Sequence, residues 1–254
     1  MTLEDLVEKS LLVLRETKSQ FENPLILWST GKDSTLTLSL CRDAFFGEVP
    51  FPVLHIDTGW EFPTMSEFRD RLAKEWNLDL IIKKSDNAGV VKPSEKMTHQ
   101  ECCQVLKTEV FRETIEKHGF DAAILSIRSD EKHSRNQDSP VENGQNELRD
   151  APKMESEKDW HPRNKYPILH WSEIDVWRYT KERNLPVNPL YFAKNGKRYK
   201  SIGFYPCSTP IKSEANTVEK IMNETQTTKT EEKPGAQEKE AKEILEKLKA
   251  LGYI

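Results

Sequence analysis

Residues 24–34 read Pro-Leu-Ile-Leu-Trp-Ser-Thr-Gly-Lys-Asp-Ser, an apolar run that changes abruptly into small polar residues. The next residues place apolar side chains on one face of a helix, at Leu36, Leu40 and Ala44. Because the first N–H groups of a helix lack intrahelical partners, a strand that turns directly into a helix presents donors to an anion. Gly31 lets the backbone approach that anion, and Lys32 adds a full positive charge. The stretch predicts a phosphate-binding loop in an α/β fold.

The loop supplies further polar groups. Its hydroxyl donors are Ser29, Thr30 and Ser34. It is not a Walker A loop, because that pattern requires a glycine where this chain has Ile26. Asp33 also has a simpler interpretation, since an acidic residue in the first turn of any helix interacts favourably with the helix dipole. By itself the loop leaves open both a phosphate site and an ordinary, well-capped helix start.

A second apolar run, Val53–Asp57, also ends in a polar turn, Thr58-Gly59-Trp60. In an open parallel sheet, ligands bind outside the carboxyl ends of the strands, so Asp57 and the first loop are expected to share one crevice. Asp57 is therefore a candidate group for ATP or for a phosphate-bound Mg²⁺. The alternative is a turn residue that caps the entry to the next helix.

The residues of these two turns resemble a known family. The loop has its Ser-x-Gly-Lys-Asp-Ser form, and residues 55–62 read His-Ile-Asp-Thr-Gly-Trp-Glu-Phe, followed by Glu-Phe-Arg-Asp-Arg at 67–71. The chain resembles the small, ATP-handling subunits of sulfate adenylyltransferase, among the PP-loop ATP pyrophosphatases. The resemblance implies that residues 29–34 grip the β- and γ-phosphates of ATP while chemistry occurs at the α-phosphorus. Phosphoadenylyl-sulfate and adenylyl-sulfate reductases carry related motifs and are the alternative family.

The fourth predicted strand, 121–126, also ends in charged residues. The segment that follows resembles the Arg-x-Asp-Glu-x-x-Arg motif of the same family, in register at Arg128, Asp130, Glu131 and Arg135. Arginine suits tetrahedral oxyanions because its planar fork donates two hydrogen bonds at once. The resemblance implies that Arg128 and Arg135 hold sulfate or the α-phosphate and that Asp130 belongs to the nucleotide site. The alternative is a solvated loop with surface ion pairs.

Strands and helices alternate along the chain, which is typical of a parallel sheet with helices on both faces. The predicted helices are 1–17, 34–45, 63–76 and 98–118, and the predicted strands are 24–28, 51–57, 78–83 and 121–126. We therefore expect an α/β fold with an open, mainly parallel twisted sheet of Rossmann-like type. The predicted catalytic domain is 1–222, followed by a flexible linker, 223–240, and a tail helix, 241–254.

Composition excludes several classes of function. The 254 residues carry a net charge of −4, which gives no basic footprint for nucleic acid. The longest apolar runs have strand length, so no membrane span is predicted. Residues 1–5 lack the basic and apolar regions that open a signal peptide. We expect a soluble, cytoplasmic protein that binds neither nucleic acid nor membrane.

The four cysteines do not form an obvious disulfide framework, since no secretory signal accompanies them. The adjacent pair Cys102 and Cys103 resembles the paired cysteines of cluster-bearing adenylyl-sulfate reductases. The Gly-Cys-x-x-Cys of those enzymes is incomplete here, because Phe204 replaces its first cysteine and only Cys207 remains. Iron–sulfur cubanes usually take four thiolates, so free thiols are expected. The alternative is a cluster that three cysteines hold and that has one open iron.

The second half of the chain carries weaker signals. Residues 136–165 are polar and aperiodic, as in a lid or a disordered loop, with His161, Arg163 and Lys165 near the end. Residues 171–177, Trp-Ser-Glu-Ile-Asp-Val-Trp, resemble a signature shared by both sulfur families, but helix capping explains them. A Pro-Leu-Tyr at 189–191 also matches the family, and 194–200 predicts a basic hairpin with an Asn-Gly turn.

Together these features predict a sulfate adenylyltransferase subunit that transfers AMP from ATP to sulfate. The resemblance implies MgATP and sulfate as substrates, Lys32, Arg128 and Arg135 as catalytic residues, and a separate GTPase subunit as partner. Asp33 or Asp57 is the candidate contact for Mg²⁺. Three alternatives stay open: a sulfonucleotide reductase, a PP-loop tRNA sulfurtransferase, and a non-enzymatic adenine-nucleotide-binding module. The reductases place a nucleophilic cysteine near the C-terminus, whereas 208–254 contain none.

Overall fold

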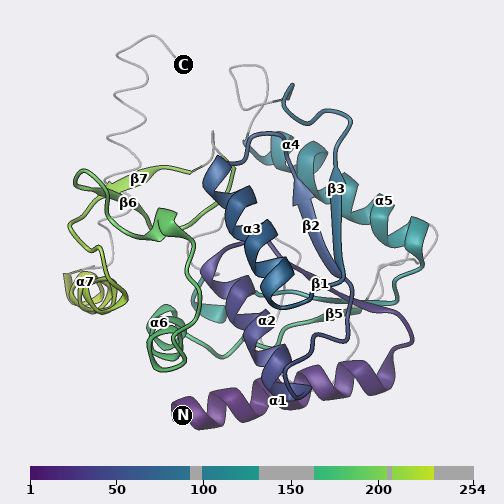
Figure 1. Ribbon diagram of the computed structural model, residues 1–254, viewed down its shortest axis with the longest axis horizontal. Coiled ribbons are helices and arrows are strands. Elements are labelled where there is room, and N and C mark those ends of the chain that lie inside the picture. The colour runs from purple at the N-terminus through teal and green to yellow at the C-terminus, as the bar shows by residue number, and fades with distance from the viewer. Residues whose placement is uncertain (92–98, 132–162, 205–207, 232–254) are drawn as a thin grey trace.

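The computed structural model describes residues 1–91, 99–131, 163–204 and 208–231 (Figure 1). Its centre is a sheet of five parallel strands in the order β3-β2-β1-β4-β5. The strands are β1 (Pro24–Leu27), β2 (Val53–Asp57), β3 (Leu80–Lys84), β4 (Ala122–Ile124) and β5 (Arg163–Lys165). The open parallel sheet expected from the sequence is confirmed.

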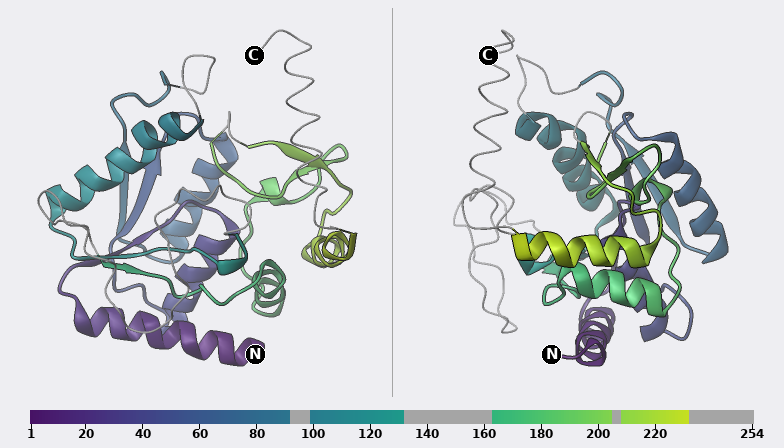
Figure 2. Two further views of the ribbon diagram at one scale, coloured as in Figure 1. Left: turned by 180° about the vertical axis from the view of Figure 1, so that it is seen from behind. Right: turned by 90° about the vertical axis from the view of Figure 1, so that its left-hand side faces the viewer.

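Helices cover both faces of the sheet, as predicted (Figures 1 and 2). They are α1 (Leu3–Gln20), α2 (Lys32–Ala44), α3 (Pro63–Glu75), and the consecutive α4 (His99–Cys103), η1 (Gln104–Thr108) and α5 (Glu109–His118). Alternate strand residues face opposite sides. Ile26 therefore packs with α1, α2 and α3, whereas its neighbour Leu25 packs with Ile115 of α5.

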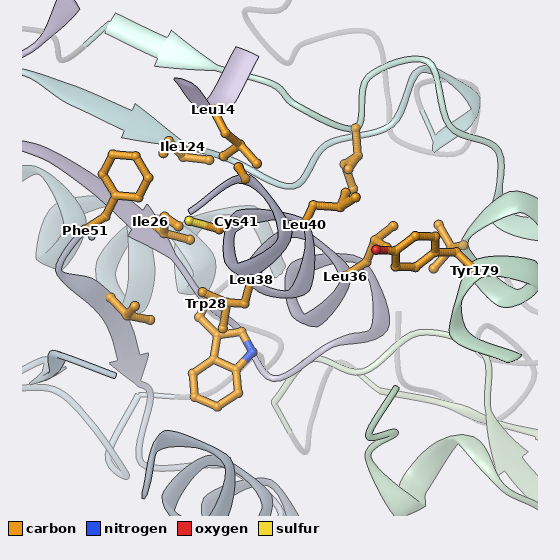
Figure 3. Close-up of a cluster of buried hydrophobic side chains, with 14 of the residues drawn as sticks. Leu14, Ile26, Trp28, Leu36, Leu38, Leu40, Cys41, Phe51, Ile124 and Tyr179 are labelled. Atoms are coloured by element: carbon orange, nitrogen blue, oxygen red, sulfur yellow. The ribbon is translucent and has the colours of Figure 1, made fainter. Parts of the chain in front are cut away.

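Helix α2 is buried on nearly every side (Figure 3). Leu36, Leu38 and Leu40 have no exposed surface and pack among side chains of the sheet, of α1 and of α6 (Glu173–Glu182). Full burial of such a side chain contributes about 1.5–3 kcal/mol, so α2 is held firmly in the core. This matters for the loop before it, because the N-terminus of α2 has a fixed position relative to the sheet.

The C-terminal part forms a smaller layer beside the sheet. It contains η2 (Ser129–Glu131), α6 (Glu173–Glu182), η3 (Pro189–Tyr191), β6 (Lys197–Tyr199), β7 (Pro210–Lys212) and α7 (Val218–Glu231). Helices α6 and α7 lie side by side (Figure 2), and Trp177 and Ile221 share one buried cluster. The predicted Asn-Gly turn is confirmed, because Asn195 and Gly196 have φ values of 54° and 73° as a hairpin turn requires. Strand β6 then pairs with β7.

Two predicted boundaries differ from the structure. The helix expected at 98–118 contains a π-helical segment, η1, which a search for 3.6-residue periodicity does not detect. Helix α7 continues to Glu231, so residues 223–231 are helical rather than part of a linker. The reason is that Ile221 and Thr225 are both buried, which anchors this face beyond residue 222. The rest of the predicted linker and the tail helix, 232–254, lie outside the described residues. No helix in the described part is long and apolar enough to cross a membrane.

Candidate nucleotide-binding site

The loop between β1 and α2 has the geometry of an anion site. Gly31 is the N-cap of α2 and has no side chain with which to cap the helix. Ser29 N–H donates to Ser34 Oγ over 3.3 Å, which closes the loop on itself. The loop lies at the carboxyl edge of the sheet, beside the point where the chain order reverses between β1 and β4. The N–H groups of the first turn of α2 therefore face the position where such sheets bind ligands.

Thr30 is the most unusual residue of the loop. Its φ of 62° is left-handed, a conformation that a β-branched residue adopts rarely and at a cost of about 1–3 kcal/mol. Its side chain is fully buried, and Oγ1 has no hydrogen-bond partner among the described residues. A buried, unsatisfied hydroxyl costs about 1–3 kcal/mol. Strain and an unused donor in one residue indicate a ligand that hydrogen-bonds there.

Charged side chains from the first turn of α2 and from the loop after β4 meet at the start of α2. Lys32 Nζ lies 3.1 Å from Asp33 Oδ2, and Arg128 Nη1 donates to Asp33 Oδ1. The side chains of Lys32 and Arg128 are only 5% and 4% exposed. Burial alone would lower the pKa of Lys32 and raise that of Asp33. The opposite charges prevail, so the pKa of Lys32 is raised and that of Asp33, beside Lys32 and Arg128, is lowered. All three groups are ionised at neutral pH.

Asp130 connects this cluster to α6. Its Oδ1 accepts a hydrogen bond of 2.9 Å from Arg128 Nε, and its Oδ2 accepts one of 2.8 Å from the backbone N–H of Glu173. Glu173 Oε1 in turn lies 3.9 Å from Lys32 Nζ. The side chain of Asp130 thus fixes the orientation of Arg128 and places α6 against the phosphate loop. The structure brings Lys32, Asp33, Arg128 and Asp130 together, as predicted.

Two residues of the site were not predicted. Tyr191 of η3 is buried, and its Oη accepts a 3.0 Å hydrogen bond from the backbone N–H of Lys32. Burial raises the pKa of Tyr191, so its hydroxyl is neutral. Glu173 was interpreted only as part of a helix cap. The signal for both was present, because 171–177 and 189–191 match the family pattern, but neither segment shows from sequence alone that it reaches the loop.

Comparisons with known proteins show to which family the chain belongs. A model of the phosphoadenosine phosphosulfate reductase domain family matches residues 23–210. Sulfate adenylyltransferase subunit 2 of Pseudomonas fluorescens strain Pf-5 is 33% identical, over 92% of this chain and 91% of that protein. The same subunit of a Methylobacterium species is 33% identical over 99% of this chain and 94% of its own length. The chain belongs to the sulfate adenylyltransferase subunit 2 family.

Solved structures support the fold of this sulfate adenylyltransferase family member. A phosphoadenylyl-sulfate reductase from Candida auris superimposes with a TM-score of 0.55 at 18% identity, over 82% of this chain and 96% of that one. An FMN adenylyltransferase from Candida glabrata gives a TM-score of 0.54 at 17% identity, over 80% of this chain and 64% of that one. At these identities the likeness establishes the α/β fold alone.

Asp57 takes part in its own turn in this adenylyltransferase family member, and its contact with ATP or Mg²⁺ stays a prediction. It ends β2 at the same edge of the sheet, but Oδ1 accepts a 2.7 Å hydrogen bond from Gly59 N–H and Oδ2 lies 3.7 Å from Lys84 Nζ. Gly59 packs so closely on the backbone of Gly89 that a Cβ would lie 2.2 Å from its nitrogen. In the described part of the chain Asp57 has no recorded contact with residues 29–34, so it stabilises the turn.

The remaining candidates divide into two groups. Arg135, His161 and Cys207 lie outside the described residues. Lys165 contacts Gln20 and the ring of Phe21 rather than the phosphate loop. Cys102 and Cys103 belong to a small apolar cluster with Leu106, Phe204, Trp60 and Val91. Among the residues that the structure describes, no three His, Cys, Asp or Glu side chains converge as a metal site requires.

Proposed function

We propose that this chain is the ATP-handling subunit of a sulfate adenylyltransferase, which converts ATP and sulfate into adenylyl sulfate and pyrophosphate. The observation that carries the proposal is the anion site at the start of α2, where the unused hydroxyl of Thr30 lies beside buried Lys32. Identity of 33% to subunit 2 proteins across nearly the whole chain supports the same function.

A sulfate oxygen attacks the α-phosphorus of ATP in line, and the bond from that phosphorus to the bridging oxygen breaks. Such transfers depend on positioning and charge neutralisation rather than on covalent catalysis. The amides and hydroxyls of residues 29–34 and Lys32 hold the leaving pyrophosphate. Arg128 holds the α-phosphate or the incoming sulfate, and Arg135 is assigned the same task. In the free protein, the carboxylate of Asp33 neutralises Lys32 and Arg128. The phosphates of the bound substrate bring further negative charge to the same two cations.

Mg²⁺ enters as part of the substrate MgATP. Neither carboxylate first considered for it is available, because both oxygens of Asp33 face cations and both oxygens of Asp57 have partners. Mg²⁺ commonly keeps several waters and binds through substrate phosphates, which suits a site without a carboxylate cage. Among the described residues no group of carboxylates forms a resident magnesium site, and no step above depends on one.

A heteromeric assembly follows from the name that the relatives share, subunit 2. We propose that the partner is a GTPase subunit, because a phosphate–sulfate anhydride is uphill from ATP and its formation needs a coupled reaction. ATP and GTP are cytoplasmic nucleotides, and so we place the enzyme in the cytoplasm. The basic segment 194–200 gives no reason to invoke nucleic acid, since the net charge is −4.

The test is incubation of the purified chain with its partner, ATP, GTP, sulfate, Mg²⁺ and pyrophosphatase. Adenylyl sulfate should form, and AMP transfer should depend on sulfate. Release of ADP and phosphate instead of pyrophosphate would exclude the PP-loop assignment. A parallel reaction with adenylyl sulfate and a dithiol reductant tests the reductase alternative, and release of sulfite there would replace our proposal with that activity.

A further inference from the structure

His55 on β2 is buried, with 1% of its surface exposed, yet the reaction described above does not use it. Both ring nitrogens lie against oxygen atoms. Nδ1 is 2.9 Å from the backbone carbonyl oxygen of Trp28, and Nε2 is 2.8 Å from Glu61 Oε1. A carbonyl oxygen only accepts hydrogen bonds, so Nδ1 carries the proton that is donated to Trp28. The side chain thus bridges the end of β1 and the turn after β2.

The carbonyl of Trp28 lies where β1 leaves the sheet, directly before the phosphate loop. Pairing between β1 and β2 continues as far as the N–H of Trp28, which donates to Leu54 O over 2.8 Å. In the described part of the chain no backbone N–H of β2 is recorded on the Trp28 carbonyl, and the imidazole of His55 takes that place. The sheet bond is thereby replaced by a side-chain bond at the point where β1 leaves the sheet.

The same peptide group is held at its other end. Its N–H belongs to Ser29 and donates to Ser34 Oγ in the first turn of α2. Because a peptide group is planar, fixing its oxygen and its N–H fixes the orientation of the whole plane. The chain then enters the strained conformation of Thr30 and the phosphate loop. The His55 contact therefore helps to determine where the loop donors point.

Glu61 holds the far side of the imidazole. Its side chain is 8% exposed, and its Oε2 lies 3.7 Å from Arg69 Nη1 of α3. Arg69 Nε also donates to Asp70. A continuous row of charged and polar groups thus runs from the surface of α3 through Glu61 and His55 to the phosphate loop. A carboxylate within hydrogen-bond distance of the second ring nitrogen accepts from it and so holds the ring in one orientation.

We propose that His55 is a positioning residue for the phosphate-binding loop and that Glu61 orients its ring. Displacement of reacting groups by about 1 Å can reduce rates on the order of 10²-fold, so a small rotation of the Trp28–Ser29 peptide matters. The kinetic consequences rest on the proposed function, whereas the consequences for the loop backbone do not. Both are measurable in the full-length chain.

The two amide replacements of histidine separate this role from simple core packing. In His55→Asn the amide nitrogen lies near the position of Nδ1 and can still donate to Trp28. In His55→Gln it lies near Nε2 and reaches Glu61 instead. We expect His55→Gln to lower kcat/KM for adenylyl sulfate formation by roughly tenfold or more, chiefly through kcat, and His55→Asn to restore most of it. Hydrogen exchange of amides 29–34 should rise in the Gln variant and stay near wild type in the Asn variant.

A matched control is Tyr179→Phe, which removes a part-buried hydrogen bond of another buried side chain, 2.6 Å from Tyr179 Oη to Asp43, far along α2 from the loop. It should lower the melting temperature without changing kcat or exchange at 29–34. Equal losses in the Asn and Gln variants, or unchanged exchange in both, would overturn the proposal. If the wild-type assembly makes no adenylyl sulfate, the proposed function fails, and the exchange rates alone decide the role of His55.

Discussion

At the scale of single residues, the site is a balance of buried charges. Two cations, Lys32 and Arg128, share the carboxylate of Asp33. Asp130 also pairs with Arg128, and Glu173 also lies near Lys32. Buried ions are stable only when their partners remain in place. An incoming polyanion is attracted to the cations, and the N–H groups of α2 add partial positive charge. Substitutions here should therefore affect stability and catalysis in separable ways.

Lys32→Ala should abolish most of the activity. Removing one preorganised donor to the charge that develops on a leaving group typically costs about 2–4 kcal/mol, which corresponds to roughly 30- to 1,000-fold in kcat. The measurement is the initial rate of pyrophosphate release with saturating sulfate. Lys181→Ala is the control, because Lys181 is 49% exposed and its ion pair with Glu219 lies on the surface. A Lys32→Ala enzyme with wild-type kcat would contradict the assigned role.

Asp33→Asn should change how stability depends on pH. Burial raises the pKa of Asp33, but Lys32 and Arg128 lower it further, so the folded value lies below 3.8. A depressed pKa contributes stability that is fully present above the unfolded value and is lost as the pH falls through the folded value. As the pH drops under about 4, the unfolding free energy of the wild type should thus decrease. The variant should lack this decrease, because it has no carboxylate to protonate at position 33.

Urea denaturation between pH 7 and pH 3 measures this difference. At pH 7 the variant should be less stable by about 3–5 kcal/mol, since two buried cations lose their shared counter-ion. Asp70→Asn is the control, because Asp70 is 62% exposed and its pair with Arg69 lies at the surface. Parallel stability curves for wild type and Asp33→Asn would show that Asp33 is not held ionised by its neighbours.

At the scale of elements, local patterns predicted most of the architecture. Apolar runs and helical spacing place β1, α2, β2 and α3 close to where the structure has them, because each is decided by its own side chains. Contacts between distant segments were not predictable in this way. Lys32 and Tyr191 are 159 positions apart, and their hydrogen bond depends on how α6 and η3 pack. The partner of Asp57 was not predictable either, since Lys84 comes from the next strand.

Helix α4 offers a test of the cysteine pair. Cys102 is fully buried in an apolar cluster, whereas Cys103 is partly exposed. Cys102→Ser buries a hydroxyl and should lower the unfolding free energy by about 1–3 kcal/mol, while Cys103→Ser should change it little. The double variant should keep adenylyl sulfate formation, and the purified protein should be colourless. Iron and sulfide at stoichiometric amounts would show instead that these thiolates hold a cluster.

At the scale of the whole molecule, the strand order explains why one edge carries the chemistry. The chain runs outward from β1 to β2 and β3, then returns to β4 on the other side of β1. The loops after β1 and β4 therefore diverge from neighbouring strands, and Arg128 reaches Asp33 across the gap. The C-terminal layer adds two contacts to the site, from Glu173 to the side chain of Lys32 and from Tyr191 to its backbone N–H. Side chains between Lys32 and Tyr191, far apart in the sequence, thus contribute to a single site.

The last prediction concerns coupling to the proposed GTPase partner. Because adenylyl sulfate formation is uphill, the full-length chain with ATP and sulfate alone should accumulate little product, and the partner with GTP should increase the yield. Residues 240–254, whose apolar positions include Ile244, Leu248 and Leu251, are the candidate segment for docking on the partner as a helix in a groove; the alternative is a helix that folds back on its own domain. Their deletion should leave ATP binding intact, measured by calorimetry, and weaken assembly in analytical ultracentrifugation. Undiminished synthesis by the chain alone, with no gain from GTP and partner, would exclude the coupling; normal assembly after the deletion would exclude the docking helix only.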